Sequence, residues 1–235
     1  MNRRFALFLL LLCAIPSCQA QPAPLPHNYK TILTNRAFRV ISVHYGPHEK
    51  VPVHSHSDSP TVYVYLNNSG PVRFIHEAPE PVSIVRPPSQ EGAFRISAGR
   101  IERHSVENLS DLDSRFLRVE LLNLQLDDKT LEFRGKAPAD DSRNLSKTEF
   151  SSPQLAVTRT ICLNPTPCTI APSDMTAILV AISDTIISNN GHPTTLKAGS
   201  VIAVAPHNGL LISPSSSEPA HILQILVPFQ KATKP

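Results

Sequence analysis

The segment Phe38-Arg39-Val40-Ile41-Ser42-Val43-His44-Tyr45 decides the fold class of this chain. It is rich in β-branched and aromatic residues, it alternates with a period of two, and it stops at Gly46-Pro47. Alternation of this kind is typical of a β-strand, in which successive side chains point to opposite faces, and a Gly-Pro pair is a turn signal. We therefore expect a strand over 38–45 and a turn directly after it.

Shorter runs of the same kind follow along the chain, each bounded by Pro, Gly, Asn, Asp or Ser. No stretch keeps an apolar period of 3.6 residues over a dozen positions, so few helices are expected. Regularly spaced short strands separated by turns indicate a sandwich or a barrel. The clearest further strands are expected at Thr61–Leu66, Val72–His76, Val82–Val85, Phe94–Ile96, Phe116–Leu124, Thr176–Ile182, Thr185–Ser188, Ser200–Ala205 and Ala220–Val227.

The composition excludes several classes of protein. Of the 235 residues, 41% are hydrophobic, which is enough for one large core or two small ones and too many for a disordered chain. The net charge of +3, from 22 basic and 19 acidic residues, is too small to drive nucleic-acid binding, so no nucleic-acid partner is expected. With 23 prolines and only 8 glycines, the chain is unsuited to long helices and to glycine-cradled phosphate sites.

Residues 1–20 have the composition of a secretory signal peptide. Arg3-Arg4 precedes an apolar run over 5–15, about half of the roughly 20 residues that span a bilayer, so no transmembrane segment is expected. Small residues at Cys18 and Ala20 predict cleavage after Ala20 and a periplasmic or secreted mature protein. A lipoprotein acylated at Cys18 is the less favoured alternative.

Cleavage after residue 20 leaves two cysteines, Cys162 and Cys168, with Pro165 and Pro167 between them. In an oxidising compartment this spacing favours a local disulfide that closes a rigid loop. A redox-active pair or a metal clip more often has two residues between its cysteines. We predict a structural disulfide between Cys162 and Cys168.

The composition changes near the middle of the chain. Residues 127–153 are rich in Asp, Lys, Ser, Pro and Ala and contain few large apolar side chains. This predicts a linker or a long loop. It divides the mature chain into a first strand-rich domain, residues 21–126, and a second, residues 154–235.

The histidines carry the strongest functional signal. Six of ten lie between His44 and His104, and His54-Ser55-His56 is the informative group. Because residues i and i+2 of a strand share one face, both imidazoles can point at one metal ion, and His104 is the candidate third ligand. Three neutral imidazoles suit one divalent transition metal ion with open coordination positions, and Fe, Mn, Ni, Cu and Zn all accept imidazole.

Two groups of residues resemble the two motifs of the cupin superfamily, and together they lie between Ala37 and Asn123. The first motif is matched by Gly46, His54, His56, the strand Thr61–Leu66 and Gly70. The second motif is matched by Gly92, Ala98-Gly99, His104 and Asn108. The resemblance implies a small antiparallel jelly-roll barrel in which the metal ligands are His54, His56 and His104.

The sequence departs from the family's motifs at two places. The usual glutamate, five residues after the second histidine, is Thr61 here. The second motif has Ala98 where proline is usual and runs two residues longer before His104. Glu102 and Glu49 are candidates for a fourth ligand, although no spacing demands either.

Other polar residues in the first domain are candidates for a ligand pocket. Thr61 and Tyr63 share a strand face, and a tyrosine hydroxyl there can donate a hydrogen bond to a ligand, although barrel aromatics usually pack in the core. The candidates for binding an anionic ligand are Arg95, Arg103 and Arg118. Arginines at strand edges are more commonly solvated and bind no ligand. Structural or rim positions are expected for His44, His48 and His76.

The second domain is similar to a cupin module that has lost its metal site. The segment 199–206 and Gly209 resemble the strand and turn of the second motif, but Ile212 stands where its histidine is expected. No pair of histidines spaced like His54 and His56 precedes it. We expect this module to hold no metal ion and either to pack against the first module or to form a homodimer.

The sequence therefore predicts an all-β protein of two antiparallel jelly-roll barrels with few helices and one metal site in the first barrel. The resemblance implies dioxygenase or isomerase chemistry on a small organic acid or sugar. One alternative is a non-enzymatic barrel that binds or senses a small-molecule ligand without metal, and another is a structural protein whose histidines are incidental. The fold by itself does not choose among them, because one fold hosts many chemistries.

Overall fold

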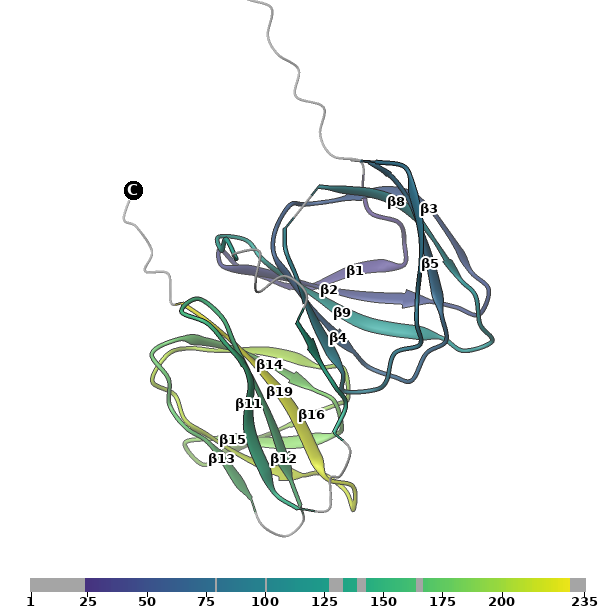
Figure 1. The fold of residues 1–235 in the computed structure, drawn as a ribbon. Coiled ribbons are helices and arrows are strands. Elements are labelled where there is room, and N and C mark those ends of the chain that lie inside the picture. The colour runs from purple at the N-terminus through teal and green to yellow at the C-terminus, as the bar shows by residue number, and fades with distance from the viewer. Residues whose placement is uncertain are drawn as a thin grey trace, which may run out of the picture.

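The computed structural model describes residues 24–78, 80–99, 101–126, 133–138, 143–163 and 167–228. Within these ranges the chain forms strands and turns and no helix, which confirms the all-β prediction (Figure 1). The described residues accordingly hold no helix long and apolar enough to cross a membrane. The predicted signal peptide, including Cys18, lies outside the described ranges.

The first barrel consists of two antiparallel sheets. One has six strands, in spatial order β1 (Tyr29–Thr34), β2 (Phe38–Tyr45), β9 (Ser114–Leu121), β4 (Thr61–Tyr65), β7 (Phe94–Ser97) and β10 (Arg134–Gly135). The other has four, in the order β3 (Lys50–His56), β8 (Glu102–Asn108), β5 (Val72–Ala78) and β6 (Val82–Arg86). Many neighbouring strands, such as β2 and β9 or β3 and β8, come from distant parts of the sequence, as expected for a jelly roll.

The second barrel repeats this arrangement. Its larger sheet has the order β11 (Leu145–Ser151), β12 (Ala156–Cys162), β19 (Ala220–Val227), β14 (Thr176–Ala181) and β17 (Val201–Val204). Its smaller sheet has the order β13 (Cys168–Ile170), β18 (Leu210–Pro214), β15 (Thr185–Asn189) and β16 (His192–Leu196). Apart from β10, which has no counterpart among the described residues of the second barrel, each order is that of the first barrel with the strand number raised by ten, so the chain contains two copies of one topology.

The segment 127–153 is not the irregular linker that its composition predicts. Its described residues include β10, which pairs with β7 of the first barrel, and β11, which pairs with β12 of the second. The prediction failed because β11 is an edge strand with most side chains partly or fully exposed, and such a strand needs few large apolar residues. The first barrel therefore extends to Gly135, and the second begins at Leu145.

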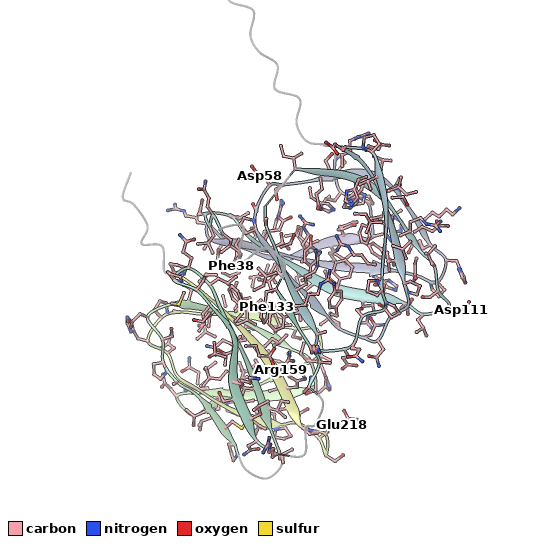
Figure 2. All side chains as sticks on the ribbon, viewed as in Figure 1. Phe38, Asp58, Asp111, Phe133, Arg159 and Glu218 are labelled. Carbon is pink, nitrogen blue, oxygen red and sulfur yellow. A yellow bond between two sulfur atoms is a disulfide. The ribbon has the colours of Figure 1, made fainter. Side chains whose placement is uncertain are left out.

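The larger sheets of the two barrels pack against each other through a shared hydrophobic core. This core contains Phe38, Val62, Phe94, Leu117 and Val119 from the first barrel, together with Val157, Ile178, Val180, Leu223 and Ile225 from the second. Phe38 and Phe133 lie between the barrels in Figure 2. The second module therefore packs against the first, which is one of the two roles expected for it.

Arg159 connects the two barrels at the edge of this core, and its side chain is fully buried. Its Nε donates to Glu149 Oε1 at 2.7 Å, and its Nη2 donates to the carbonyl of Lys136 at 3.0 Å. Its Nη1 donates to the carbonyl of Gly92 at 2.8 Å and to Nε2 of His221 at 2.7 Å. Because a guanidinium has donors only, His221 accepts through Nε2 and carries its proton on Nδ1.

Replacing Leu223 by alanine tests the shared core. Leu223 is fully buried between the sheets, so we expect the free energy of unfolding to fall by about 2–5 kcal/mol. Chemical denaturation measures the loss, and both barrels should unfold in one transition because they share this core. The matched control is Leu211→Ala, at a side chain that is 50% exposed, and its effect should stay within about 0.5 kcal/mol. Two separate transitions in the wild type would contradict the shared core.

The buried histidine beside Arg159 predicts a pH dependence of stability. Burial, and then the Arg159 charge, lower the pKa of His221 to about 3, whereas a histidine of the unfolded chain titrates near 6.5. Between these values the unfolded chain binds a proton that the folded chain does not, so stability is lost as the pH falls from about 6.5 towards 3. In denaturation of metal-free protein, His221→Gln should lose less stability on acidification than the wild type. The exposed-site control His192→Gln should follow the wild type.

Candidate metal centre

The structure brings the three predicted histidines together inside the first barrel. His54 and His104 are paired across β3 and β8, and His56 is paired with Glu102. All three imidazoles are buried, their ring centres lie 4.8–5.1 Å apart, and one nitrogen of each lies within 4.8 Å of the others. The prediction that these side chains share one face is correct in the structure.

A β-bulge in β3 places both histidines inside the barrel. Val51 is paired with Val106, and His54 is paired with His104, so three steps along β3 match two along β8. Without the extra residue, Val51 and His54 would point to opposite faces, because side chains alternate. The bulge includes Pro52, which suits a position where the ladder of hydrogen bonds is interrupted.

The hydrogen bonds of His54 fix its protonation state. Its Nδ1 lies 2.8 Å from the Pro52 carbonyl oxygen, which only accepts, so Nδ1 carries the proton. Its Nε2 lies 2.9 Å from the hydroxyl oxygen of Tyr29 and accepts from it. A ring held in this way presents a lone pair on Nε2 toward the barrel interior, which is the form that binds a metal ion.

The other two imidazoles have ring nitrogens without hydrogen-bond partners. Both ring nitrogens of His104 and Nδ1 of His56 are buried in this way. Burial is the main reason why the pKa of His104 falls to about 3 and that of His56 falls well below its usual value, so both rings are neutral. Unpartnered buried nitrogens of neutral imidazoles are suited to a metal ion. An ion would draw the rings closer, since two ligands at about 2.1 Å from it are at most about 4.2 Å apart.

The two glutamates considered as a fourth ligand differ in position. Glu102 is buried beside the cluster, with Oε2 4.0 Å from Nδ1 of His104. Glu49 accepts hydrogen bonds from Asn28 Nδ2 at 2.8 Å and from the Gly46 amide at 2.7 Å, and these lower its pKa. Glu49 therefore holds a turn and does not belong to the cluster.

The remaining histidines of the first barrel surround the centre at different depths. His44 and His48 are exposed and lie 3.0 Å from Asp113 and 2.8 Å from Asp111, as expected for rim residues. His76 is buried on β5 opposite His104, with the two ring centres 5.1 Å apart. His76 is therefore part of the wall behind the cluster.

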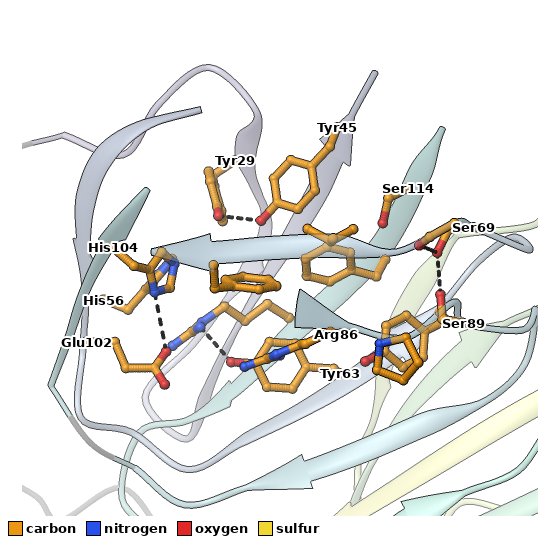
Figure 3. A pocket seen from close by; sticks show the side chains of 17 residues that line it. Tyr29, Tyr45, His56, Tyr63, Ser69, Arg86, Ser89, Glu102, His104 and Ser114 are labelled. Carbon is orange, nitrogen blue, oxygen red and sulfur yellow. Dashed lines mark hydrogen bonds and ion pairs between the residues drawn. The ribbon is translucent and has the colours of Figure 1, made fainter. Parts of the chain in front are cut away.

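A pocket opens next to the cluster and is lined by aromatic and charged side chains (Figure 3). The cavity has a volume of about 50 Å³, which is room for a few water molecules. Tyr63 lines the pocket as predicted, whereas Thr61 does not, and the Thr61 hydroxyl donates to the Ser59 carbonyl at 3.0 Å. The lining includes Tyr29, Tyr45, His56, Phe74, Arg86, Glu102, His104, Phe116 and Arg118.

The three arginines considered from the sequence have different environments. Arg118 lines the pocket and donates to Glu120 at 2.9 Å and to the Tyr63 hydroxyl at 2.8 Å. Arg95 lies with its guanidinium carbon 4.2 Å from the centre of the Tyr63 ring. Arg103 is half exposed and pairs with Glu77 at 2.9 Å, away from the pocket lining.

Sequence reasoning missed several pocket residues, among them Arg86 and Tyr29. The guanidinium carbon of Arg86 lies 4.3 Å from the centre of the Phe74 ring, and no ion pair of Arg86 is found among the described residues. Burial, and then the nearby charge of Arg95, lower the pKa of Arg86. Tyr29 precedes the region that resembles the family motifs, so no motif pointed to it.

The second barrel has no equivalent cluster among its described residues. Cys168, Ile212 and Ile187 form the row that corresponds to His54, His104 and His76 in the first barrel. Ile212 is fully buried in an apolar core. The apolar interior of the second barrel agrees with the prediction that this module has lost its metal site.

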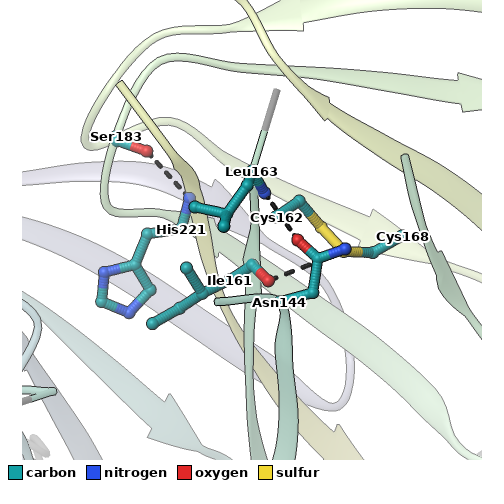
Figure 4. Close-up of a disulfide and its surroundings, with 7 residues drawn as sticks. All are labelled: Asn144, Ile161, Cys162, Leu163, Cys168, Ser183 and His221. Atoms are coloured by element: carbon teal, nitrogen blue, oxygen red, sulfur yellow. Dashed lines mark hydrogen bonds between the residues drawn. A yellow bond between two sulfur atoms is a disulfide. The ribbon is translucent and has the colours of Figure 1, made fainter. Parts of the chain in front are cut away.

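A disulfide joins Cys168 to Cys162, as predicted, with Cα atoms 5.7 Å apart (Figure 4). Asn144 lies beside it, and its Oδ1 accepts from the Leu163 amide at 2.8 Å. The bridge ties the end of β12 to the start of β13, so it closes a loop of the second barrel.

Comparison with solved structures shows the same fold at low sequence identity. A Cupin 2 conserved barrel domain protein from Leptotrichia buccalis has a TM-score of 0.52 and 14% identity, over 88% of this chain and 91% of that one. A mutant of the salicylate 1,2-dioxygenase from Pseudoaminobacter salicylatoxidans has a TM-score of 0.53 and 9% identity, over 81% and 70%. A mutant of the oxalate decarboxylase OxdC from Bacillus subtilis has a TM-score of 0.52 and 13% identity, over 83% and 70%.

No family model and no curated protein sequence matches the chain. The resemblance seen in the sequence motifs is nevertheless supported by the structure, since a solved structure with the same fold is named as a Cupin 2 conserved barrel domain protein. The chain is a cupin-fold protein with two barrels, and its first barrel contains a three-histidine cluster suited to a metal ion.

Proposed function

We propose that this protein binds one divalent transition metal ion through His54, His56 and His104 and catalyses a reaction of a small organic molecule in the adjacent pocket. The observation that carries the proposal is the cluster of three buried imidazoles, in which both ring nitrogens of His104 and Nδ1 of His56 lack hydrogen-bond partners. When bound, such an ion supplies Lewis-acid or oxygen-activating chemistry, which suits a dioxygenase or an isomerase. The structural likeness to a salicylate dioxygenase supports this direction.

The charges around the pocket favour a small organic acid as the ligand. Arg86 is an always-charged, partly buried group that lines the pocket and has no ion pair with a carboxylate among the described residues. A ligand carboxylate would give it paired hydrogen bonds and offset the cost of its burial. The small open volume favours a small ligand.

Other pocket residues hold the reacting molecule in a defined environment. Arg118 is fixed by Glu120, which is fully buried and also accepts from Arg39 Nε at 2.7 Å. The Arg118 guanidinium in turn holds the Tyr63 hydroxyl. Phe74 and Phe116 supply apolar wall that excludes water, so the polar contacts act in a medium of low dielectric constant.

The metal content of mature protein, purified without a histidine tag, tests the centre. We expect about one ion per chain, lost in the double variant His54→Ala/His104→Ala while circular dichroism shows the fold retained. The control His44→Ala/His48→Ala removes two exposed histidines and should keep the ion. If the wild type takes up none of Fe, Mn, Ni, Cu and Zn, the catalytic proposal fails, and a metal-free binding or sensing barrel becomes the better account.

Titration calorimetry with acetate, glycolate and oxalate tests the ligand class. Arg86→Gln should weaken the tightest of these by roughly 10–100-fold, because a charge-assisted hydrogen bond contributes about 1.5–3 kcal/mol. Arg103→Gln is the matched control, since Arg103 is paired with Glu77 outside the pocket. Equal binding by Arg86→Gln and the wild type would remove the argument for an acidic ligand.

We also propose that the mature protein is periplasmic or secreted. The predicted signal peptide supports this location, and so does the Cys162–Cys168 disulfide, because disulfides persist mainly in oxidising compartments. A homodimer remains a prediction from the sequence. The packing of the second barrel on the first already accounts for one of its apolar faces.

A further inference from the structure

Tyr29 contacts the candidate metal centre from outside the motif region. It lies on β1, the edge strand of the larger sheet, and is 9% exposed. Its ring centre is 4.7 Å from that of His54 and 5.2 Å from that of His56. Its hydroxyl oxygen lies 2.9 Å from His54 Nε2 and 2.6 Å from the hydroxyl oxygen of Tyr45. Figure 3 shows Tyr29 and Tyr45 joined above the two pocket histidines.

The distance from Tyr29 to His54 is one that two ligands of a single ion have. The Pro52 carbonyl holds the proton of His54 on Nδ1, so Nε2 is the atom left for the ion. Two ligand atoms at about 2.0–2.1 Å from an ion, with a right angle between their bonds, are about 2.9 Å apart. Tyr29 Oη lies at this separation from Nε2 before any ion is bound. An ion on His54 Nε2 therefore has the Tyr29 oxygen within reach.

We propose that Tyr29 is the fourth protein ligand of the metal ion and takes the role that Thr61 cannot fill. This inference rests on the proposed metal centre. On coordination, the hydrogen bond from Tyr29 to His54 is replaced by bonds from both atoms to the ion, and the phenol proton leaves to the solvent. The Tyr45 hydroxyl, 2.6 Å away, then donates its hydrogen bond to the bound oxygen.

Glu102 is the competing fourth ligand. Its nearer carboxylate oxygen is 4.0 Å from His104 Nδ1, which is longer than the contact of Tyr29 with His54. Glu102 also projects from β8 directly opposite His56, so it reaches the cluster from the side of the pocket. The two candidates predict different spectra, because a bound phenolate gives Cu²⁺ a charge-transfer band in visible light and a carboxylate does not.

The test is the addition of Cu²⁺ to metal-free full-length mature protein, followed by visible absorption and by the dissociation constant of copper. The wild type should show a phenolate-to-copper band. Tyr29→Phe should lose the band and bind copper at least about tenfold more weakly. Tyr65→Phe makes the same change at another pocket tyrosine and should keep both the band and the copper affinity. Glu102→Gln should also keep the band.

Each result has one meaning. If the wild type binds copper without the band, or if Tyr29→Phe keeps band and affinity, Tyr29 is not a ligand, although the three-histidine centre stands. If the wild type binds no copper, the metal centre fails and this inference fails with it. If copper binding is lost in His54→Ala/His104→Ala and the band is lost in Tyr29→Phe alone among the tyrosine variants, the assignment is established. Because absence of the band in the wild type needs no variant, poor folding of Tyr29→Phe would not hide a negative answer.

Discussion

The position of every other part of the molecule depends on the packing of the two larger sheets against each other. Strands β4, β9, β14 and β19 are buried on both faces, because one face lines its own barrel and the other contacts the partner barrel. Apolar surface on the outer faces of both barrels is thereby removed from water, which is the main stabilising contribution available to a chain without helices in its described residues. Arg159 adds polar contacts at the edge of this interface.

This packing leaves the smaller sheet of the first barrel free to carry polar chemistry. Its strands β3, β8 and β5 have histidines in adjacent inward positions, with His104 between His54 and His76. In the second barrel the same row is Cys168, Ile212 and Ile187, and the interior is apolar. One topology therefore serves as a candidate site in one copy and as a packed core in the other. The side chains of this row differ between the copies, and so does the pairing, because β3 and β5 have register shifts against β8 whereas β13 and β15 pair with β18 without one.

Hydrogen bonds fix the orientation and the protonation of polar side chains inside the first barrel. The Pro52 carbonyl sets the tautomer of His54, and Glu120, placed between Arg39 and Arg118, holds the Arg118 guanidinium toward Tyr63. These contacts pre-position groups around the pocket before a ligand binds, which lowers the cost of ordering them on binding. His104 and His56 are exceptions, since both nitrogens of His104 and Nδ1 of His56 lack hydrogen bonds. A bound metal ion would give these nitrogens a partner.

The sequence by itself determined the strands with strong alternation, such as 38–45 and 220–227, the common face of His54 and His56, and the loss of a ligand at Ile212. Period-two patterns report local backbone geometry, which is why they can be read from neighbouring residues. Only the tertiary structure decided that β11 is a strand, that a bulge at Pro52 turns His54 inward, and that Tyr29 and Arg86 reach the centre. These features depend on which distant strands lie side by side, and that choice is made by burial of apolar surface across the whole chain, which leaves no local pattern at the residues concerned.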